Sequence, residues 1–389
     1  MRSFTVEERR ARLARRHLLT RDVPLDVPTI TARLVALHAT DPATPFLSLW
    51  ARSPGFVVAD LETALYEQRS VLKHLAMRRT LWVIAASDLG AVQAASSDRV
   101  ATDERRRLLA DAVKAGVTSA GEEWLAAASS AVLDHLAEHG PTGARELRAA
   151  LPELAGDYDP APGRTWGGTT PLSPRVLTVL GVQGHIVRGP NDGAWTTSRH
   201  RWSSTAHWLP GHAGAHAAEV ARERVVRRWL WAFGPATEAD VTWWFGQTLG
   251  WTRAALRDVG AVEVDLHGTP GVALPDDLEP EPAVEPWCAL LPGLDVTTMG
   301  WRHRDWYLGD HRAHVFDRNG NAGPTAWVDG RVVGGWRQDD AGRVELQLVE
   351  DVGATASRAL QRMAGELTDW LAGVRVKPRF PSPLSKAPA

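Results

Sequence analysis

The stretches HLAEHGPTGARELRAAL (135–151) and WLWAFGPATEADVTWWF (229–245) decide the fold, because they are copies of one pattern. They align without a gap. In both, an aromatic residue or a histidine precedes Gly-Pro, and four variable residues, an acid and an aliphatic residue follow. Glycine commonly ends a helix, and proline prevents its continuation. The Gly-Pro pairs at 140–141 and 234–235 therefore each predict the end of one helix, with a second helix just beyond.

Each copy continues into the same order of elements. Thr142 and Thr237 are expected to cap the second helix of their copies, and a third helix and two strands are expected after it. Turn residues at 189–193 and 268–271 join the strand segments, which indicates a wing hairpin. Two winged helices explain the repetition, and two generic helical hairpins are the alternative. The segments are SPRVLTVLGVQGHIVRG with GAWTTS, and WTRAALRDVGAVEVDLHG with GVALP.

The first 120 residues read as mostly helical with a closing strand. MRRTLWVIA (77–85) is rich in β-forming residues, and a helix capped by Ser87 is expected after it. Helix, helix and strand is the order of a further winged helix. The helices are expected from apolar residues at helical spacing, namely Ile30, Leu34, Leu37, Leu61, Leu65, Leu72 and Leu75.

The C-terminal part reads as an acidic linker followed by β structure. Residues 276–286 form a proline-rich linker with five acids and no base. Short strands with frequent turns then suggest a small β-barrel or half-barrel with a closing helix. The expected fold class is α+β, with tandem winged-helix domains followed by a small C-terminal β-barrel. The expected domains span 1–120, 121–210, 211–275 and 287–372.

The composition indicates a folded protein of the cytoplasm. Apolar residues make up 44% and charged residues 23%, which excludes collagen-like and largely disordered classes. Cys288 is the single cysteine, so an intramolecular disulfide and a four-cysteine zinc site are excluded. No apolar signal segment opens the sequence, and no run of about 18 apolar residues follows it. We expect a cytoplasmic monomer without membrane contact.

Motifs for several enzyme classes are missing from the sequence. It has no G-x-S-x-G, no phosphate-binding loop with lysine and no G-x-G-x-x-G after a strand. HLAEH (135–139) matches a zinc-peptidase pattern, but the second copy of the repeat has Trp229 and Phe233 there, which argues for a packing role. We expect no metal and no cofactor; a histidine metalloenzyme is an alternative that bound zinc would reveal. Its ligands would come from two loose clusters, His207, His212 and His216, or His303, His311 and His314.

The segment RLVALHATDPATPFLSLWAR (33–52) carries the candidate catalytic groups. An amphipathic helix is expected to run into His38, Thr40 and Asp41, after which Pro42 forces the chain out of the helix. Three polar side chains would thus meet at one helix end. The alternative is a structural helix end, with His38 favourable at the negative pole of the helix and Asp41 starting an Asx turn.

Several stretches resemble the winged-helix DNA-binding family that contains the AlkZ and YcaQ-type bacterial DNA glycosylases. They are HATDPATPFLSLWAR, LKHLAMRRTLWVI, the two Gly-Pro helix starts, LLPGLDVTTMGWRHRDWYLG and PTAWVDGRVVGGWR, and the likeness covers roughly residues 8–372. The resemblance implies three tandem winged helices and a β-barrel in a C-shaped clamp around double-stranded DNA. It also implies removal of alkylated or crosslinked purines by hydrolysis of the N-glycosidic bond without a metal.

The resemblance assigns roles to residues of this sequence. The family's loop carries Gln, an aliphatic residue and then Gln or Asp, where this sequence has His38, Ala39 and Thr40, with Asp41 next. We expect His38 to activate water, Thr40 to hold it and Asp41 to stabilise positive charge at the sugar. The expected DNA contacts are Arg78, Arg79, Arg164, Arg188, Arg302 and Arg304, with Asp295 and Asp305 as structural partners of the last two.

Two functions of other classes compete with the glycosylase interpretation. The first is a non-catalytic winged-helix regulator, which would bind DNA with sequence preference and release no base. The second is a protein that sequesters a DNA-alkylating small molecule and needs no DNA. Fold alone does not separate these functions.

Overall fold

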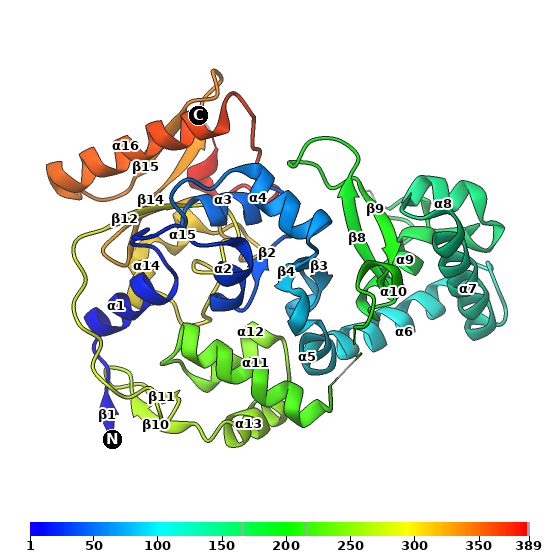
Figure 1. The fold of residues 1–389 in the computed structure, drawn as a ribbon, viewed down its shortest axis with the longest axis horizontal. Coiled ribbons are helices and arrows are strands. Elements are labelled where there is room, and N and C mark those ends of the chain that lie inside the picture. Colours follow the sequence, from blue (N-terminus) through cyan, green and yellow to red (C-terminus); the bar gives the residue numbers. More distant parts are fainter. Residues whose placement is uncertain (165–166, 213, 215, 387–389) are drawn as a thin grey trace.

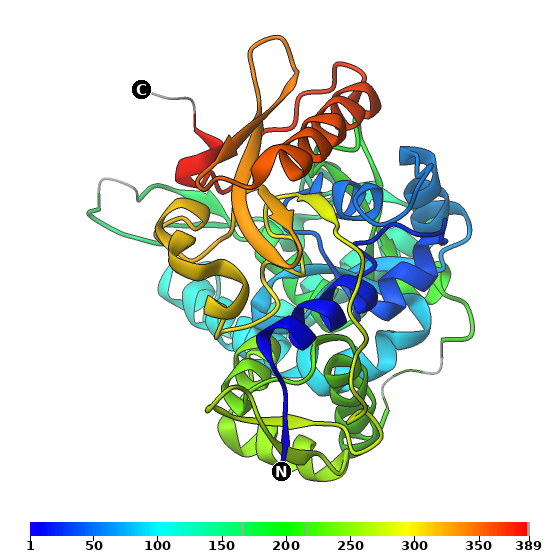
Figure 2. The same ribbon diagram turned by 90° about the vertical axis from the view of Figure 1, so that its left-hand side faces the viewer.

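The computed structural model describes residues 1–164, 167–212, 214 and 216–386. These residues form a mixed α+β fold with five small sheets. Figure 1 shows α7 to α9 with the β8–β9 hairpin on one side of the molecule, α11 to α13 below, and α16 at the other end. Figure 2 gives the view from the left-hand side of Figure 1, with the N-terminus at the bottom. None of the described helices is both long and apolar enough to cross a membrane.

Two three-stranded sheets share one order of elements, in which a short strand, two helices and two antiparallel strands follow one another. The first strand pairs with the last, which gives the orders β2-β4-β3 and β5-β9-β8. The first set comprises α2 (Val27–Arg33), β2 (Leu37–His38), α3 (Thr44–Trp50), α4 (Val58–Glu62), β3 (Val71–Leu75) and β4 (Leu81–Ala85). The second set comprises α7 (Gly121–His139), β5 (Thr142–Gly143), α8 (Ala144–Ala150), α9 (Ser173–Val182), β8 (Ile186–Asn191) and β9 (His200–Ser204).

A third sheet joins the start of the chain to its second half. Its order is β1-β10-β11, with β1 parallel to β10, and a bridge between Ala236 and Val272 adds a further contact. Its elements are β1 (Arg2–Ser3), α11 (Ala218–Phe233), α12 (Glu238–Phe245), α13 (Leu249–Asp258), β10 (Val262–Asp265) and β11 (Pro270–Ala273). Further α-helices are α1 (Val6–Arg16), α5 (Leu89–Val92), α6 (Asp98–Lys114), α10 (Thr205–Trp208), α14 (Asp305–Leu308) and α15 (Arg312–Val315).

The helix ends predicted from the repeated Gly-Pro pairs are confirmed. Helix α7 ends at His139 and α11 at Phe233, directly before the two glycines. Thr237 caps α12, because its hydroxyl accepts a hydrogen bond from the Asp240 N–H (3.1 Å). The same prediction for Thr142 is wrong: its hydroxyl donates to the Gly140 carbonyl (2.9 Å) instead, one position before the true cap of α8.

The predicted helix that runs through Leu37 into His38 is wrong. Helix α2 ends at Arg33, and Val35 has a φ of 67°, a left-handed conformation that a continuing helix cannot contain. Leu37 and His38 form strand β2 and pair with β4. His38 therefore lies in an edge strand of a sheet, and Thr40 and Asp41 follow that strand.

The prediction for the closing strand also needs correction. Leu72 and Leu75, expected on a helix, lie in β3. The strand expected over 77–85 begins only at Leu81, because the chain turns at Arg78 and Arg79, whose φ values are 55° and 59°. This turn connects β3 to β4 as an antiparallel hairpin.

The C-terminal strands form an open sheet. Of the small β-barrel or half-barrel expected within 287–372, the described residues do not form a closed barrel: β12 and β15 are the two edges of an antiparallel sheet of order β12-β13-β14-β15. Helix α16 contacts both edge strands and so covers the sheet without closing it. The elements are β12 (Cys288–Leu291), β13 (Thr325–Val328), β14 (Arg331–Gln338), β15 (Val344–Leu348) and α16 (Gly353–Leu371).

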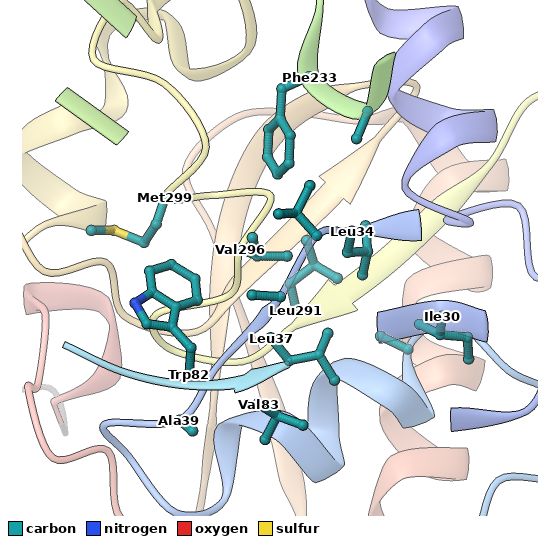
Figure 3. Close-up of a cluster of buried hydrophobic side chains, with 14 of the residues drawn as sticks. Ile30, Leu34, Leu37, Ala39, Trp82, Val83, Phe233, Leu291, Val296 and Met299 are labelled. Carbon is teal, nitrogen blue, oxygen red and sulfur yellow. The ribbon is translucent and has the colours of Figure 1, made fainter. Parts of the chain in front are cut away.

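One buried cluster joins the first sheet, α11 and the C-terminal sheet. Figure 3 shows Leu37 and Trp82 of the first sheet near Leu291 and Val296 of the C-terminal part, with Phe233 from the end of α11 above them. All five side chains are almost fully buried. The first and last parts of the chain therefore share a core, and burial of this apolar surface fixes where loop 38–41 lies.

The acidic linker is tied to the first helix. Arg12 and Arg16 of α1 bind the carboxylate of Asp277 at 2.9 and 2.7 Å, and Arg15 binds that of Glu281 at 2.9 Å. The segment expected to be a linker thus lies along α1 and is held there by ion pairs.

The hairpin β8–β9 packs against the first part of the chain, where β8 contacts β3 and the hairpin loop contributes Trp195. Trp195, in the loop between the strands, lies 4.9 Å from the ring of Phe46 in α3 and 5.8 Å from that of Trp370 in α16. Figure 1 shows this loop extending toward α3 and α4. These contacts hold the hairpin, whose strand β8 carries Arg188, against β3 and against α3, the helix that follows loop 38–41.

Candidate functional site

His38 lies in the sheet beside Trp82. The register pairs His38 of β2 and His74 of β3 with Trp82 of β4, so all three side chains project from one face of the sheet. The His38 side chain is buried, and its ring meets that of Trp82 edge to face, with 4.8 Å between the centroids. Its Nδ1 accepts a long hydrogen bond from the Thr40 N–H (3.4 Å).

The surroundings keep His38 neutral. Burial lowers the pKa of His38 to about 3, and the positive charge of Arg78 adds to the effect. A neutral imidazole with this pKa accepts a proton poorly, so His38 is suited to hold a water molecule by hydrogen bonding rather than to deprotonate it.

Thr40 links β4 to the C-terminal segment, the first through its hydroxyl and the second through its backbone carbonyl. Its hydroxyl accepts a hydrogen bond from the Leu81 N–H at the start of β4 (3.2 Å). Its carbonyl accepts one from Arg379 Nη1 (3.2 Å), which comes from the C-terminal segment. Thr40 therefore holds the loop against both neighbours.

Asp41 is held on both carboxylate oxygens. Oδ1 accepts the Ala43 N–H (3.1 Å), which is the Asx turn of the structural alternative, and Oδ2 accepts the Arg379 N–H (2.9 Å). Burial raises the pKa of Asp41 against the opposing effect of these two hydrogen bonds. The carboxylate thus fastens the loop to the C-terminal segment.

Arg78, which lies beside His38, and Arg304 are two cations without an ion-pair partner among the described residues. The Arg78 guanidinium lies 4.0 Å from the centre of the Trp243 ring, and that of Arg304 lies 5.0 Å from the same ring. Nε and Nη2 of Arg78 are buried and have no hydrogen-bond partner among the described residues. Burial, together with a smaller effect of the positive charge of Arg304, lowers the pKa of Arg78 to about 9. Uncompensated buried cations of this kind are suited to an anionic ligand.

The other arginines expected to contact DNA lie in different settings. Arg79 is exposed and forms an ion pair with Glu104 (2.6 Å). Arg302 is also exposed. Arg188 lies in β8, whereas Arg164 is exposed in the segment between β6 (Asp157–Tyr158) and β7 (Thr170–Pro171). Arg164 and Arg188 therefore lie in different segments of the second strand-and-helix set.

Asp295 belongs to a buried network that sequence reasoning missed. Expected as a partner of the barrel arginines, it binds Arg52 at the end of α3 instead, and both side chains are fully buried. Burial raises the pKa of Asp295, but the charge of Arg52 and the hydrogen bonds from Arg52, Ser48 and Thr297 outweigh this and lower it overall. The network fixes α3, which follows loop 38–41, against the C-terminal part.

The histidine clusters do not meet as ligand sets. His303 lies within hydrogen-bond distance of the Thr237 hydroxyl (3.1 Å), and His311 lies 3.0 Å from a Glu350 oxygen. Among the described residues, no three His, Cys, Asp or Glu side chains are placed to hold a metal ion. His135 and His139 stack on each other at 4.3 Å, and His139 is exposed, so the packing role expected for HLAEH does not apply to it.

Comparison with known proteins gives one family and a similar fold. Residues 31–370 match the model of a family described as "DNA glycosylase AlkZ-like". No curated protein matches the sequence. Among solved structures, the Streptomyces sahachiroi DNA glycosylase AlkZ is similar, with a TM-score of 0.75 and 20% sequence identity, covering 96% of this chain and 98% of that one. At this identity the structural likeness establishes the fold.

Proposed function

Because the chain belongs to the AlkZ-like DNA glycosylase family, we propose that it binds double-stranded DNA and hydrolyses the N-glycosidic bond of alkylated or crosslinked purines. One observation carries the proposal. The loop His38 to Asp41, at the position of the family's catalytic loop, lies beside Arg78, whose charge has no carboxylate partner among the described residues.

We further propose that the three strand-and-helix sets are winged helices spanning 1–120, 121–210 and 211–275, which surround the duplex together with residues 287–372. Strand, two helices and a hairpin is the order that this interpretation requires. Arg78, Arg79, Arg188 and Arg304 would then contact phosphates, and the exposed Arg164 and Arg302 would contribute to the outer part of the same interface.

The chemistry asks little of the protein. An N3- or N7-alkylated purine is cationic and leaves readily, so the site must mainly orient a water molecule and stabilise the sugar as it becomes positive. In our proposal the neutral imidazole of His38 holds this water. Thr40 and Asp41 act by fixing the loop, because their oxygen atoms are already bound by backbone N–H groups and by Arg379.

The first test is abasic-site formation in duplex DNA that contains N7-methylguanine, read as strand breakage after alkali. We expect His38→Ala to lower the rate by about 100-fold, since a single well-placed catalytic group contributes roughly that factor. His38→Gln, which introduces the residue that the family carries there, is expected to keep most of the activity. His74→Ala is the matched control, because it removes a buried histidine on the other side of Trp82.

A non-catalytic DNA-binding protein is the second candidate function. The observation that favours it is the low basicity of His38 together with the occupied oxygens of Asp41. If the wild-type protein binds duplex DNA but forms no abasic sites on N7-methylguanine or on a bulkier or crosslinked lesion, this second function is correct and the glycosylase proposal fails.

A further inference from the structure

The C-terminal segment 375–386 returns to loop 38–41 after helix α16. Its path is held by Gln338 of β14, whose Oε1 accepts the Val376 N–H (2.8 Å) and whose Nε2 donates to the Val374 carbonyl (3.0 Å). The segment then reaches Asp41, which accepts the Arg379 N–H. It lies beyond the residues matched by the family model, which end at 370.

Two glycines make room for this segment. A Cβ atom at Gly323 would lie 2.1 Å from Ser382 Oγ, and one at Gly335 would lie 3.2 Å from the Cβ of Leu384. Ser382 is fully buried. The segment therefore packs closely against the fold, and its hydrogen bond with Asp41 is one of the contacts that hold it there.

The C-terminal segment places the positive charge of Arg379 next to loop 38–41. The Arg379 side chain is exposed, and its Nη1 donates to the Thr40 carbonyl. It forms no ion pair within the described parts of the chain. A guanidinium bound only to a carbonyl keeps donors free for an anion.

Two further cations, Arg188 and Lys73, lie on strands near Arg379. The Arg188 side chain of β8 has neither a hydrogen bond nor an ion pair among the described residues, and its guanidinium lies 5.4 Å from the centre of the Trp202 ring. Lys73 of β3 is buried, and its ammonium donates to the Tyr66 hydroxyl (3.1 Å). Burial and, to a smaller extent, the charge of Arg379 lower the pKa of Arg188 to about 10. Burial and the charge of Arg188 lower the pKa of Lys73 to about 8. These cations are close enough to repel one another, and an anion between them would relieve this cost.

We propose that Arg379 and Arg188 together bind a phosphate of the DNA backbone beside loop 38–41, and that Asp41 is the positioning residue that holds Arg379 in place. The proposal rests on the DNA binding of the proposed function and extends it to a segment outside the family match. The phosphodiester is the chemistry that suits two guanidinium groups from different parts of the chain, since each presents a fork of N–H donors to oxygen.

The test is the salt dependence of binding to an unmodified duplex, measured by fluorescence anisotropy between about 50 and 200 mM salt. Each phosphate contact contributes about 0.9 to the slope of log affinity against log salt. We expect Arg379→Ala to reduce the slope by about one and the affinity at low salt by roughly tenfold. Arg379→Lys should keep the slope, because the charge remains. Arg375→Ala is the matched control: Arg375 is an exposed arginine of the same segment that donates to the Asp340 carbonyl, and its loss should leave the slope unchanged.

The role of Asp41 is tested by coupling. Asp41→Ala should remove the same unit of slope as Arg379→Ala, and the double variant should lose no more than either single variant. A merely structural role of Asp41 would lower the folded fraction without changing the slope. Gly323→Ala, which pushes against Ser382, should also lower the slope, and Ser382→Gly in addition should restore it.

The outcomes separate this proposal from the proposed function. Duplex binding with an unchanged slope for Arg379→Ala overturns the phosphate site alone, whatever the cleavage assay gives. Absence of duplex binding by the wild-type protein overturns both. Loss of the slope unit in a protein that forms no abasic sites supports the phosphate site and rejects the glycosylase.

Discussion

Replacing Arg52 with alanine is expected to lower the free energy of unfolding by about 3–5 kcal/mol, because it leaves the carboxylate of Asp295 buried without its partner. The Arg52 guanidinium donates to both Asp295 oxygens (2.9 and 2.7 Å), to the carbonyls of His17 and Ser48 and to the Thr297 hydroxyl. Water cannot replace these contacts, since neither side chain of the pair is exposed. Equilibrium denaturation in urea measures the change.

An exposed ion pair provides the control for this prediction. Arg253 and Glu238 are 3.2 Å apart, with side chains 58% and 36% exposed, so Arg253→Ala is expected to cost less than about 1 kcal/mol. The double replacement of Arg52 and Asp295 by methionine and leucine should recover much of the loss, because it removes both charges together. Equal effects of Arg52→Ala and Arg253→Ala would contradict the prediction.

Acid is expected to unfold the protein well above the pH at which carboxylates titrate. Burial lowers the pKa of His17, His38 and His74 to about 3, 3 and 4, from an ordinary value near 6.5. Below pH 6.5 these histidines are protonated in the unfolded chain but stay neutral in the folded chain. The free energy of unfolding therefore decreases as the pH falls toward the pKa values of the folded state. At pH 5 each histidine costs about 2 kcal/mol, and the three together cost about 6, a large part of a typical stability of about 5–15 kcal/mol.

Denaturation curves at pH 7, 6 and 5 test this expectation. The unfolding free energy should fall by up to about 4 kcal/mol per pH unit near pH 5, which corresponds to about three protons taken up. His74→Gln should reduce the uptake by about one proton while leaving the Arg52 network and loop 38–41 untouched. Stability that stays constant from pH 7 to pH 5 would show that these histidines are not buried in their neutral form.

Local chemistry explains what the sequence predicts correctly. Glycine and proline act on their own backbone, so the Gly-Pro pairs at 140–141 and 234–235 place the ends of α7 and α11 without any knowledge of the rest of the fold. The cap at Thr237 is equally local. The family itself is recognisable because its motifs are spread over most of the chain.

The candidate site was less predictable, because distant partners determine it. A strand of two residues, such as Leu37–His38, has no periodicity of its own and exists only through pairing with Val83 and Trp82. The sequence predicted that His38, Thr40 and Asp41 lie together. It gave no sign that Arg379 binds the Thr40 carbonyl from 339 positions away and one Asp41 carboxylate oxygen from 338 positions away. A signal was available for the acidic linker, since the arginines of α1 carry the complementary charge.

The parallel pairing of β1 with β10 has a consequence for biosynthesis. Phe4 is fully buried against Val264 and Leu266, and Arg16 donates to the Trp231 carbonyl (2.6 Å), so the first residues of the chain have their partners in its second half. A nascent chain leaves the ribosome from its N-terminus, and these residues must wait without native contacts until residue 265 has been made. Residues 2–16 are therefore synthesised well before their partners, and their packing is completed late.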